Sequence, residues 1–183
     1  MNPEPEGHYR PNVGIALFNR NGLVLMARRL GNDGPEIVLP GHEWQMPQGG
    51  IDGEEDLLTT ARRELWEETN VTSAVPLGST SDWVSYDFPP YAGPPHRLSP
   101  FRGQRQRWVA FRFTGEESEI EVAGVRGGMV PEFSAWRWES LERAPELVVP
   151  FKRAVYEHVA REFRAFKGKA LTAQPAAAAP ARR

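Results

Sequence analysis

The chain has 183 residues, of which 40% are hydrophobic and 25% charged, and these fractions are ordinary for one globular domain. The absence of cysteine excludes disulfide bridges, thiolate metal sites and a cysteine nucleophile. No apolar run approaches the roughly 18 residues needed to cross a bilayer, and the start of the chain lacks the basic and apolar regions of a signal peptide. We therefore expect a cytoplasmic protein with no membrane partner.

The net charge of -2 conceals two segments of opposite charge. Residues 52–68 contain seven acids and two arginines, whereas residues 97–112 contain five arginines and no acid. Arginine outnumbers lysine by 19 to 3. A GC-rich genome would produce this excess, and so would phosphate binding, because a guanidinium group can pair with two phosphate oxygens at once. The arginine segment, residues 97–112, is therefore a candidate phosphate-facing surface.

Strand and helix patterns alternate along the chain. Alternating and short apolar runs predict strands at 13–18, 23–27, 43–46, 80–86, 106–113 and 133–138. Glycine, proline and asparagine predict turns or loops at 19–22, 31–42, 49–50 and 88–95. Spacings of three and four predict helices over 55–69 and 151–166. This order predicts an α+β fold with a mixed or largely antiparallel sheet in one domain, 9–167, between disordered tails at 1–8 and 168–183.

Both predicted helices have an apolar side. In the first, Leu58, Ala61 and Leu65 share one face, which we expect to pack on the sheet. Asn70 is expected to end this helix, because asparagine tolerates the left-handed conformation of a C-terminal cap. In the second, the apolar stripe runs through Phe151, Val155, Val159, Phe163 and Phe166.

Three carboxylates of the first helix, Glu64, Glu67 and Glu68, fall at i, i+3 and i+4 and point into one small volume. Like charges at this spacing repel each other. A solvated acidic face would tolerate that repulsion, and a divalent cation would relieve it, since magnesium prefers carboxylate oxygens. The helix is therefore a candidate metal site.

The surrounding spacing favours the metal site. Gly49, then five residues, Glu55, then seven residues and the run Arg63–Glu68 reproduce the Nudix box, with Asn70 in place of its last glycine. The chain thus resembles the Nudix hydrolases. That resemblance implies a mixed sheet sandwiched between α-helices and the hydrolysis of nucleoside diphosphates linked to another moiety.

The resemblance also implies roles for the residues of the box. Magnesium, or manganese, in two or more ions would be bound by Glu64, Glu67 and Glu68, with Glu64 and Glu68 catalytic and Glu64 a candidate base. Gly49, Glu55, Arg63 and Asn70 would be structural. Outside the box, Glu132 matches a further metal carboxylate of the family, and a surface acid beside Pro131 is the less favoured alternative.

Further segments resemble one branch, the bacterial RNA pyrophosphohydrolases and the asymmetric diadenosine tetraphosphate hydrolases, namely 9–14, 44–51, 103–108, 131–138 and 151–156. By this resemblance the substrate-binding residues would be Arg10, Arg29, Tyr86, Gln104, Phe151 and Lys152. Surface ion pairs for the two arginines, and a core position for Phe151, are the alternatives. The loop 31–42 is longer than in enterobacterial members.

Three functions remain open on the sequence. The first is removal of pyrophosphate from the 5′-triphosphate end of RNA, to leave a 5′-monophosphate. The second is asymmetric cleavage of diadenosine tetraphosphate, a dinucleoside polyphosphate. The third is a non-catalytic module that binds nucleotides, which the intact acids Glu64, Glu67, Glu68 and Glu132 disfavour. The sequence does not identify a stimulating protein partner, for which the resemblance leaves room.

Overall fold

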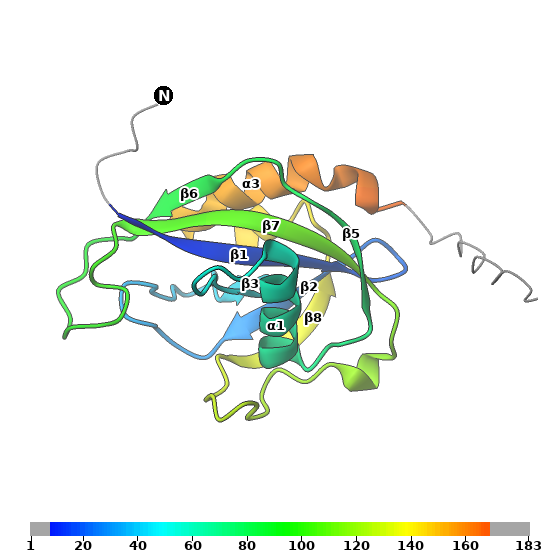
Figure 1. Cartoon of the computed structure of the whole chain (residues 1–183), viewed down its shortest axis with the longest axis horizontal. Helices are drawn as coiled ribbons and strands as arrows, with labels where there is room; N and C mark the ends of the chain where they lie inside the picture. Colours follow the sequence, from blue (N-terminus) through cyan, green and yellow to red (C-terminus); the bar gives the residue numbers. More distant parts are fainter. Residues whose placement is uncertain (1–7, 169–183) are drawn as a thin grey trace, which may run out of the picture.

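A mixed sheet lies between helices on its two faces in the computed structural model, which describes residues 8–168 (Figure 1). The strands are β1 (Tyr9–Phe18), β2 (Val24–Arg29), β3 (Trp44–Gln45), β4 (Gln48–Gly50), β5 (Ala74–Ser79), β6 (Val84–Asp87), β7 (Gly103–Phe113) and β8 (Phe133–Glu139). The helices are α1 (Leu57–Thr69), α2 (Ala144–Leu147) and α3 (Arg153–Glu162), with 3-10 turns at Glu117–Glu119, Pro150–Lys152 and Arg164–Phe166. The predicted α+β class is confirmed.

The predicted tails, 1–8 and 168–183, lie outside the described residues except for His8 and Gly168. Among residues 8–168 we find no helix with the length and apolar content that a membrane span requires.

Strand β1 organises the sheet, whose central order is β3-β2-β1-β7-β5. It runs parallel to β7 from Tyr9 opposite Gly103 to Phe18 opposite Arg112, whereas the other strand pairs are antiparallel. Its pairing with β2 is confined to the hairpin end, and further along the same edge it pairs with β4. The residues of β4 are thereby placed beside Asn12, at the end of the sheet where the site lies.

Each face of the sheet has its own hydrophobic core. Trp108 and Tyr156 lie in the core under α2 and α3, and their rings meet edge to face with centroids 5.3 Å apart. Ile15 and Phe111 lie in the core under α1. As predicted, the stripe of α3 is inward, since Val155, Val159 and Phe163 are almost fully buried and Phe151 and Phe166 pack partly against the same core.

The first helix differs from the prediction at its start and in its buried face. It begins at Leu57 because Asp56 is the N-cap, whose Oδ1 accepts from the backbone N–H groups of Leu58 and Thr59, both at 3.1 Å. Leu58 is 38% exposed, so its predicted packing on the sheet is wrong, and Leu57 packs there instead. At the other end Asn70 has φ 65° and forms the predicted left-handed cap.

Two strand features also differ from the sequence prediction. The tight turn expected at Gly49–Gly50 is wrong, because both residues belong to β4 and neither has a positive φ. Strand β5 was not predicted, because Pro76 and Gly78 interrupt its apolar pattern, and the register shifts between these two residues. Proline is tolerated there because β5 is an edge strand.

We predict that Asp56→Ala lowers the free energy of unfolding by about 1 kcal/mol, because two N-terminal amides of α1 lose their acceptor. Urea unfolding followed by circular dichroism measures the change. Asp56→Asn is the matched control, since asparagine caps helices about as well as aspartate. Equal losses in the two variants would show that the cap does not stabilise the helix.

Candidate active site

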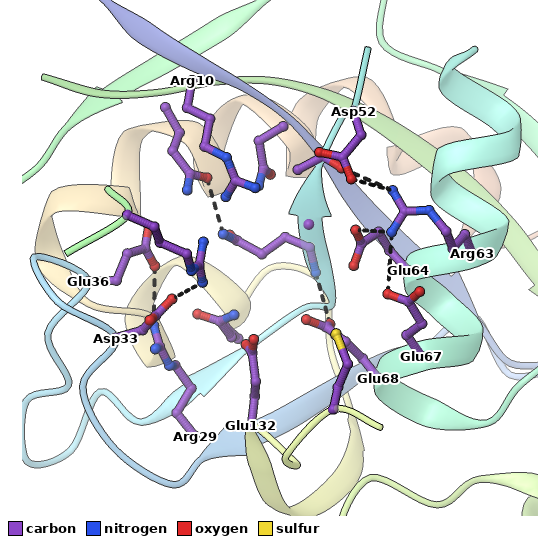
Figure 2. Close-up of a pocket in the computed structure, with 18 of the residues that line it drawn as sticks. Arg10, Arg29, Asp33, Glu36, Asp52, Arg63, Glu64, Glu67, Glu68 and Glu132 are labelled. Atoms are coloured by element: carbon purple, nitrogen blue, oxygen red, sulfur yellow. Dashed lines mark hydrogen bonds and ion pairs between the residues drawn. The ribbon is translucent and has the colours of Figure 1, made fainter. Parts of the chain in front are cut away.

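Arg63, in the middle of α1, binds three elements at once, and Figure 2 shows it beside Asp52, Glu64 and Glu67. Its Nε and Nη2 donate to Glu55 in the preceding loop at 3.2 and 2.9 Å, and Nη2 also donates to the backbone oxygen of Gly50 at 3.2 Å. Its Nη1 donates to Glu64 at 2.7 Å and to Glu67 at 3.3 Å. One guanidinium group therefore ties the loop, β4 and the acidic face of α1 together.

The two glycines of β4 provide space rather than a special backbone conformation. A Cβ atom on Gly49 would lie 1.9 Å from Cδ of Glu64, and one on Gly50 would lie 2.1 Å from Nη2 of Arg10. A side chain at either position would displace its charged neighbour. The strand thus brings an acid of α1 and a base of β1 against its backbone from two directions.

Carboxyl groups gather on the buried, inner side of α1. Glu64 and Glu68 are each 8% exposed, on the same side of the helix as Ala61 and Leu65 rather than opposite them. Burial raises the pKa of Glu64 to about 7, although Arg63 opposes the shift. Burial and the charge of Glu132 raise the pKa of Glu68 well above its usual value, and burial raises that of Glu132. Bound cations would favour the ionised forms of all three.

A pocket of about 640 Å³ lies between this acidic wall and three arginines (Figure 2). Of the predicted site residues it is lined by Gly49, Arg63, Glu64, Glu67, Glu68, Glu132, Arg10, Arg29 and Gln104. Arg97 lines the pocket as well and pairs with Asp33. A polyanion in this pocket would meet both the arginines and any cations that the acids of α1 bind, although Arg29 and Arg97 are already paired with the lining acids Glu36 and Asp33.

The other three predicted substrate contacts do not line this pocket. Tyr86 is 5% exposed and Lys152 is fully buried, and both contact Glu36 of the loop 31–42. Phe151 packs against Tyr86, with ring centroids 5.8 Å apart, at the edge of the core. The structure therefore places these side chains beneath the pocket, where they support its floor.

The arginine segment 97–112 does not form a single phosphate-facing surface. Arg97 reaches the pocket and pairs with Asp33, while Arg102 pairs with an aspartate of β6. Arg105 lies over a tryptophan ring, and Arg107 and Arg112 donate to backbone oxygens. The prediction from charge composition was wrong for most of the segment, because these side chains point to different faces of β7 and to its two ends.

The acids fit a divalent cation in chemistry, since Glu64, Glu67, Glu68 and Glu132 supply the carboxylate oxygens that hard cations prefer. Among the described residues no three acidic or histidine side chains already converge as a metal centre. In this structure Arg63 binds Glu64 and Glu67, and Glu68 accepts from the backbone N–H of Gln48 at 3.1 Å.

Several polar residues of the pocket were not predicted, among them Asn12, Asp33, Glu36, Gln45 and Gln48. Two of them, Gln45 and Gln48, lie in the run Trp44–Gln48. Polar glutamines in short, otherwise apolar strands could have indicated a polar site there. No sequence signal indicated Glu36, because its burial depends on how the loop 31–42 folds back onto β2 and onto the turn before α3.

The sequence matches the NUDIX domain family over residues 8–159. It is 54% identical over 159 residues to the RNA pyrophosphohydrolase of Azorhizobium caulinodans, a match that covers 86% of this chain and 94% of that protein. The RNA pyrophosphohydrolase of Agrobacterium fabrum is 48% identical over 161 residues, which cover 88% of this chain and 95% of that protein. The chain therefore belongs to the Nudix family. It is a hydrolase of phosphoric anhydride bonds, in a family that uses divalent metal ions.

Solved structures share the fold at low sequence identity. The MutT protein of Methanosarcina mazei is 21% identical with a TM-score of 0.57, and the alignment covers 87% of this chain and 98% of that one. A C. elegans Ap4A hydrolase is 17% identical with a TM-score of 0.53, over 87% and 98%. At these identities the likeness establishes the Nudix fold alone.

We predict that Gly49→Ala lowers kcat by about 10-fold or more while the protein stays folded, because the new methyl group must push the Glu64 carboxylate aside. Steady-state kinetics and circular dichroism measure the two effects. Gly31→Ala is the control, since a Cβ there meets nothing within 4 Å. Unchanged kcat in Gly49→Ala would contradict the steric role.

Proposed function

We propose that this enzyme removes pyrophosphate from 5′-triphosphorylated RNA and leaves a 5′-monophosphate. The observation that supports this most is the pocket itself, in which the acids Glu64, Glu67, Glu68 and Glu132 and three arginines line one space about 640 Å³ in volume. The relatives at about half identity over most of the chain are RNA pyrophosphohydrolases.

In the proposed reaction a water oxygen attacks one phosphorus of the triphosphate, the P–O–P bond breaks in line, and pyrophosphate leaves. Glu64 accepts the proton of the attacking water. Arg10, Arg29 and Arg97 bind the phosphate chain from the opposite side.

The proposed cofactor is magnesium, or manganese, in two or more ions held by the four acids. When bound, these ions would neutralise the phosphate oxygens and lower the pKa of the attacking water. The proposed substrate, a bacterial transcript, locates the enzyme in the cytoplasm. A stimulating protein partner stays a prediction.

We predict that Glu68→Gln lowers kcat by about 100-fold or more and leaves the unfolding free energy unchanged or higher, because glutamine avoids the cost of ionising a buried carboxyl group beside Glu132. Turnover with magnesium and urea unfolding test the two parts. Glu157→Gln, on the exposed side of α3, is the matched control. Near-normal turnover in Glu68→Gln would remove the catalytic assignment. Absence of turnover in both the native enzyme and the variant would favour the non-catalytic module.

We predict that kcat/KM is at least about tenfold higher for triphosphorylated RNA than for diadenosine tetraphosphate, measured with one preparation in magnesium. Both substrates place a polyphosphate over the acids, so the difference reports on contacts beyond the phosphates. A preference for the dinucleotide would replace the RNA proposal by the dinucleoside polyphosphate hydrolase.

A further inference from the structure

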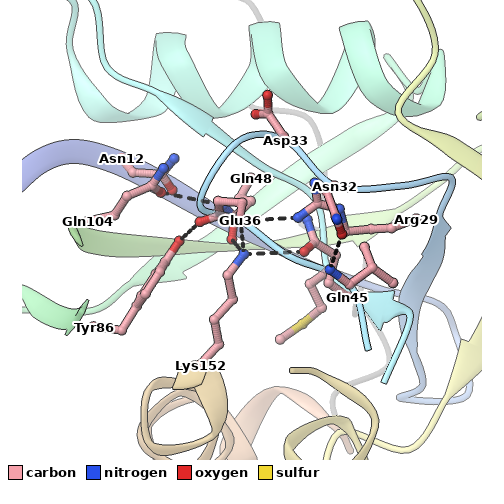
Figure 3. Close-up of polar contacts among 12 residues, drawn as sticks. Asn12, Arg29, Asn32, Asp33, Glu36, Gln45, Gln48, Tyr86, Gln104 and Lys152 are labelled. Atoms are coloured by element: carbon pink, nitrogen blue, oxygen red, sulfur yellow. Dashed lines mark hydrogen bonds and ion pairs between the residues drawn. The ribbon is translucent and has the colours of Figure 1, made fainter. Parts of the chain in front are cut away.

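Lys152 has no hydrogen-bond donor left for a substrate. Its side chain is fully buried below the pocket, and Nζ donates to Oε2 of Glu36 at 2.5 Å and to Oε1 of both Gln45 and Gln48 at 3.3 Å (Figure 3). An ammonium group has three donors and no acceptor, so these contacts saturate it. Its charge is balanced by Glu36, which also pairs with Arg29 at 3.1 Å.

The contacts of Lys152 set the direction of the carboxamides above it. An amide whose oxygen faces an ammonium group must turn its NH2 group the other way. Gln48 gives its oxygen to Lys152 and its Nε2 to the oxygen of Gln104, at 3.4 Å. Gln45 gives its oxygen to Lys152 as well. The NH2 groups of Gln45 and Gln104 are thereby left to point elsewhere.

On β7, Trp108 likewise fixes the orientation of a side-chain amide, that of Gln106. Nε1 of Trp108, which can only donate, bonds to the oxygen of Gln106 at 3.2 Å. Gln106 then donates through Nε2 to the oxygens of Asn12 at 2.8 Å and of Gln48 at 3.1 Å. The oxygen of Asn12 is therefore occupied, and its NH2 group is not.

The outcome is a set of amide donors in the pocket wall. Asn12, Gln45 and Gln104 line the pocket, and their exposed fractions are only 1%, 3% and 2%. Each accepts a hydrogen bond through its oxygen, and none of the three NH2 groups donates to another group among residues 8–168. These three NH2 groups are not among the fully buried atoms that lack a partner, so they are accessible from the pocket and can donate to a ligand that offers acceptors.

We propose that Asn12, Gln45 and Gln104 form a donor-only subsite for the anionic oxygens of the substrate polyphosphate, and that Lys152 is a positioning residue that orients this subsite without touching the substrate. The proposal deepens the proposed function and rests on it. Phosphate oxygens only accept hydrogen bonds, whereas the edges of most bases combine donors with acceptors. Because the subsite is uncharged, it binds phosphate without forming ion pairs with the neighbouring acids.

The direct test measures the dissociation constant of inorganic triphosphate with magnesium, for the native enzyme and for Asn12→Asp, Gln45→Met and the control Asn21→Asp. Asn21 is exposed in the turn after β1, so its variant adds the same charge away from the pocket. Each pocket variant is expected to weaken binding about 10-fold, as for a lost hydrogen bond to a charged group, and the control by less than about twofold. Pocket variants that bind as the control does would overturn the subsite.

A double-mutant cycle tests the role of Lys152. Lys152→Met keeps the length of the side chain, and pairing it with Glu36→Gln avoids an uncompensated buried acid. This pair of changes is expected to weaken triphosphate binding about 10-fold in the native background and at least about threefold less in Gln45→Met, because part of its effect passes through Gln45. Equal effects in both backgrounds would mean that Lys152 contacts the substrate itself.

Nuclear magnetic resonance separates the subsite from the proposed function. The side-chain NH2 signals of Asn12, Gln45 and Gln104 should shift when inorganic triphosphate is added, whether or not the enzyme hydrolyses RNA. If these signals respond to RNA with a 5′-hydroxyl end and not to triphosphate, the subsite binds the RNA backbone and the assignment to the polyphosphate is wrong. If RNA is not a substrate but the signals still shift, the proposed function fails and the subsite stands.

Discussion

The compensation of buried acids by one guanidinium group is the interaction on which the pocket depends. Arg63 binds Glu64, which is nearly buried, and Glu67 beside it, and a charge so far from water is stable only with a partner. Arg63 supplies donors to the helix, to the loop before it and to the backbone of β4. A lysine has three donors on a flexible stem and could not make all these contacts from one rigid plane. The same contacts therefore hold the acids in place and fix the three elements that carry them.

Below the pocket the structure buries a cation, Lys152, that does not reach the pocket itself. Lys152 is balanced by Glu36 and passes its influence upward through carboxamides. The pocket lining therefore combines acids, amides and arginines. The pairing with Lys152 also gives the loop 31–42 a structural reason to be present, because Glu36 is its contribution.

The parts of the site that were predictable from sequence are the local ones. Glu64, Glu67 and Glu68 share a helical face at any position in a fold, and the cap at Asn70 needs only a tolerated φ. Lys152 was predicted to bind the substrate, whereas it is buried, and its burial depends on an acid 116 residues earlier. The prediction that residues 97–112 face phosphate was wrong for most of the segment, because a count of charges does not show which acids, rings or backbone oxygens the arginines contact. Leu57 and Leu58 are adjacent and equally apolar, so the sequence alone does not tell which of them is buried. The helix that begins after the N-cap Asp56 leaves Leu58 exposed.

The parallel pairing of β1 with β7 has a consequence for how the enzyme is made. Asn12 and Gln106 touch across 94 residues of chain, and Glu132 comes later still. During synthesis the first strand leaves the ribosome long before its central neighbour exists, and contacts so distant in sequence form slowly. Its unpaired edge must therefore stay protected from other chains while most of the protein is translated. The pocket is then among the last features of the molecule to assemble, and a truncated product would lack it even where α1 and its acids are complete.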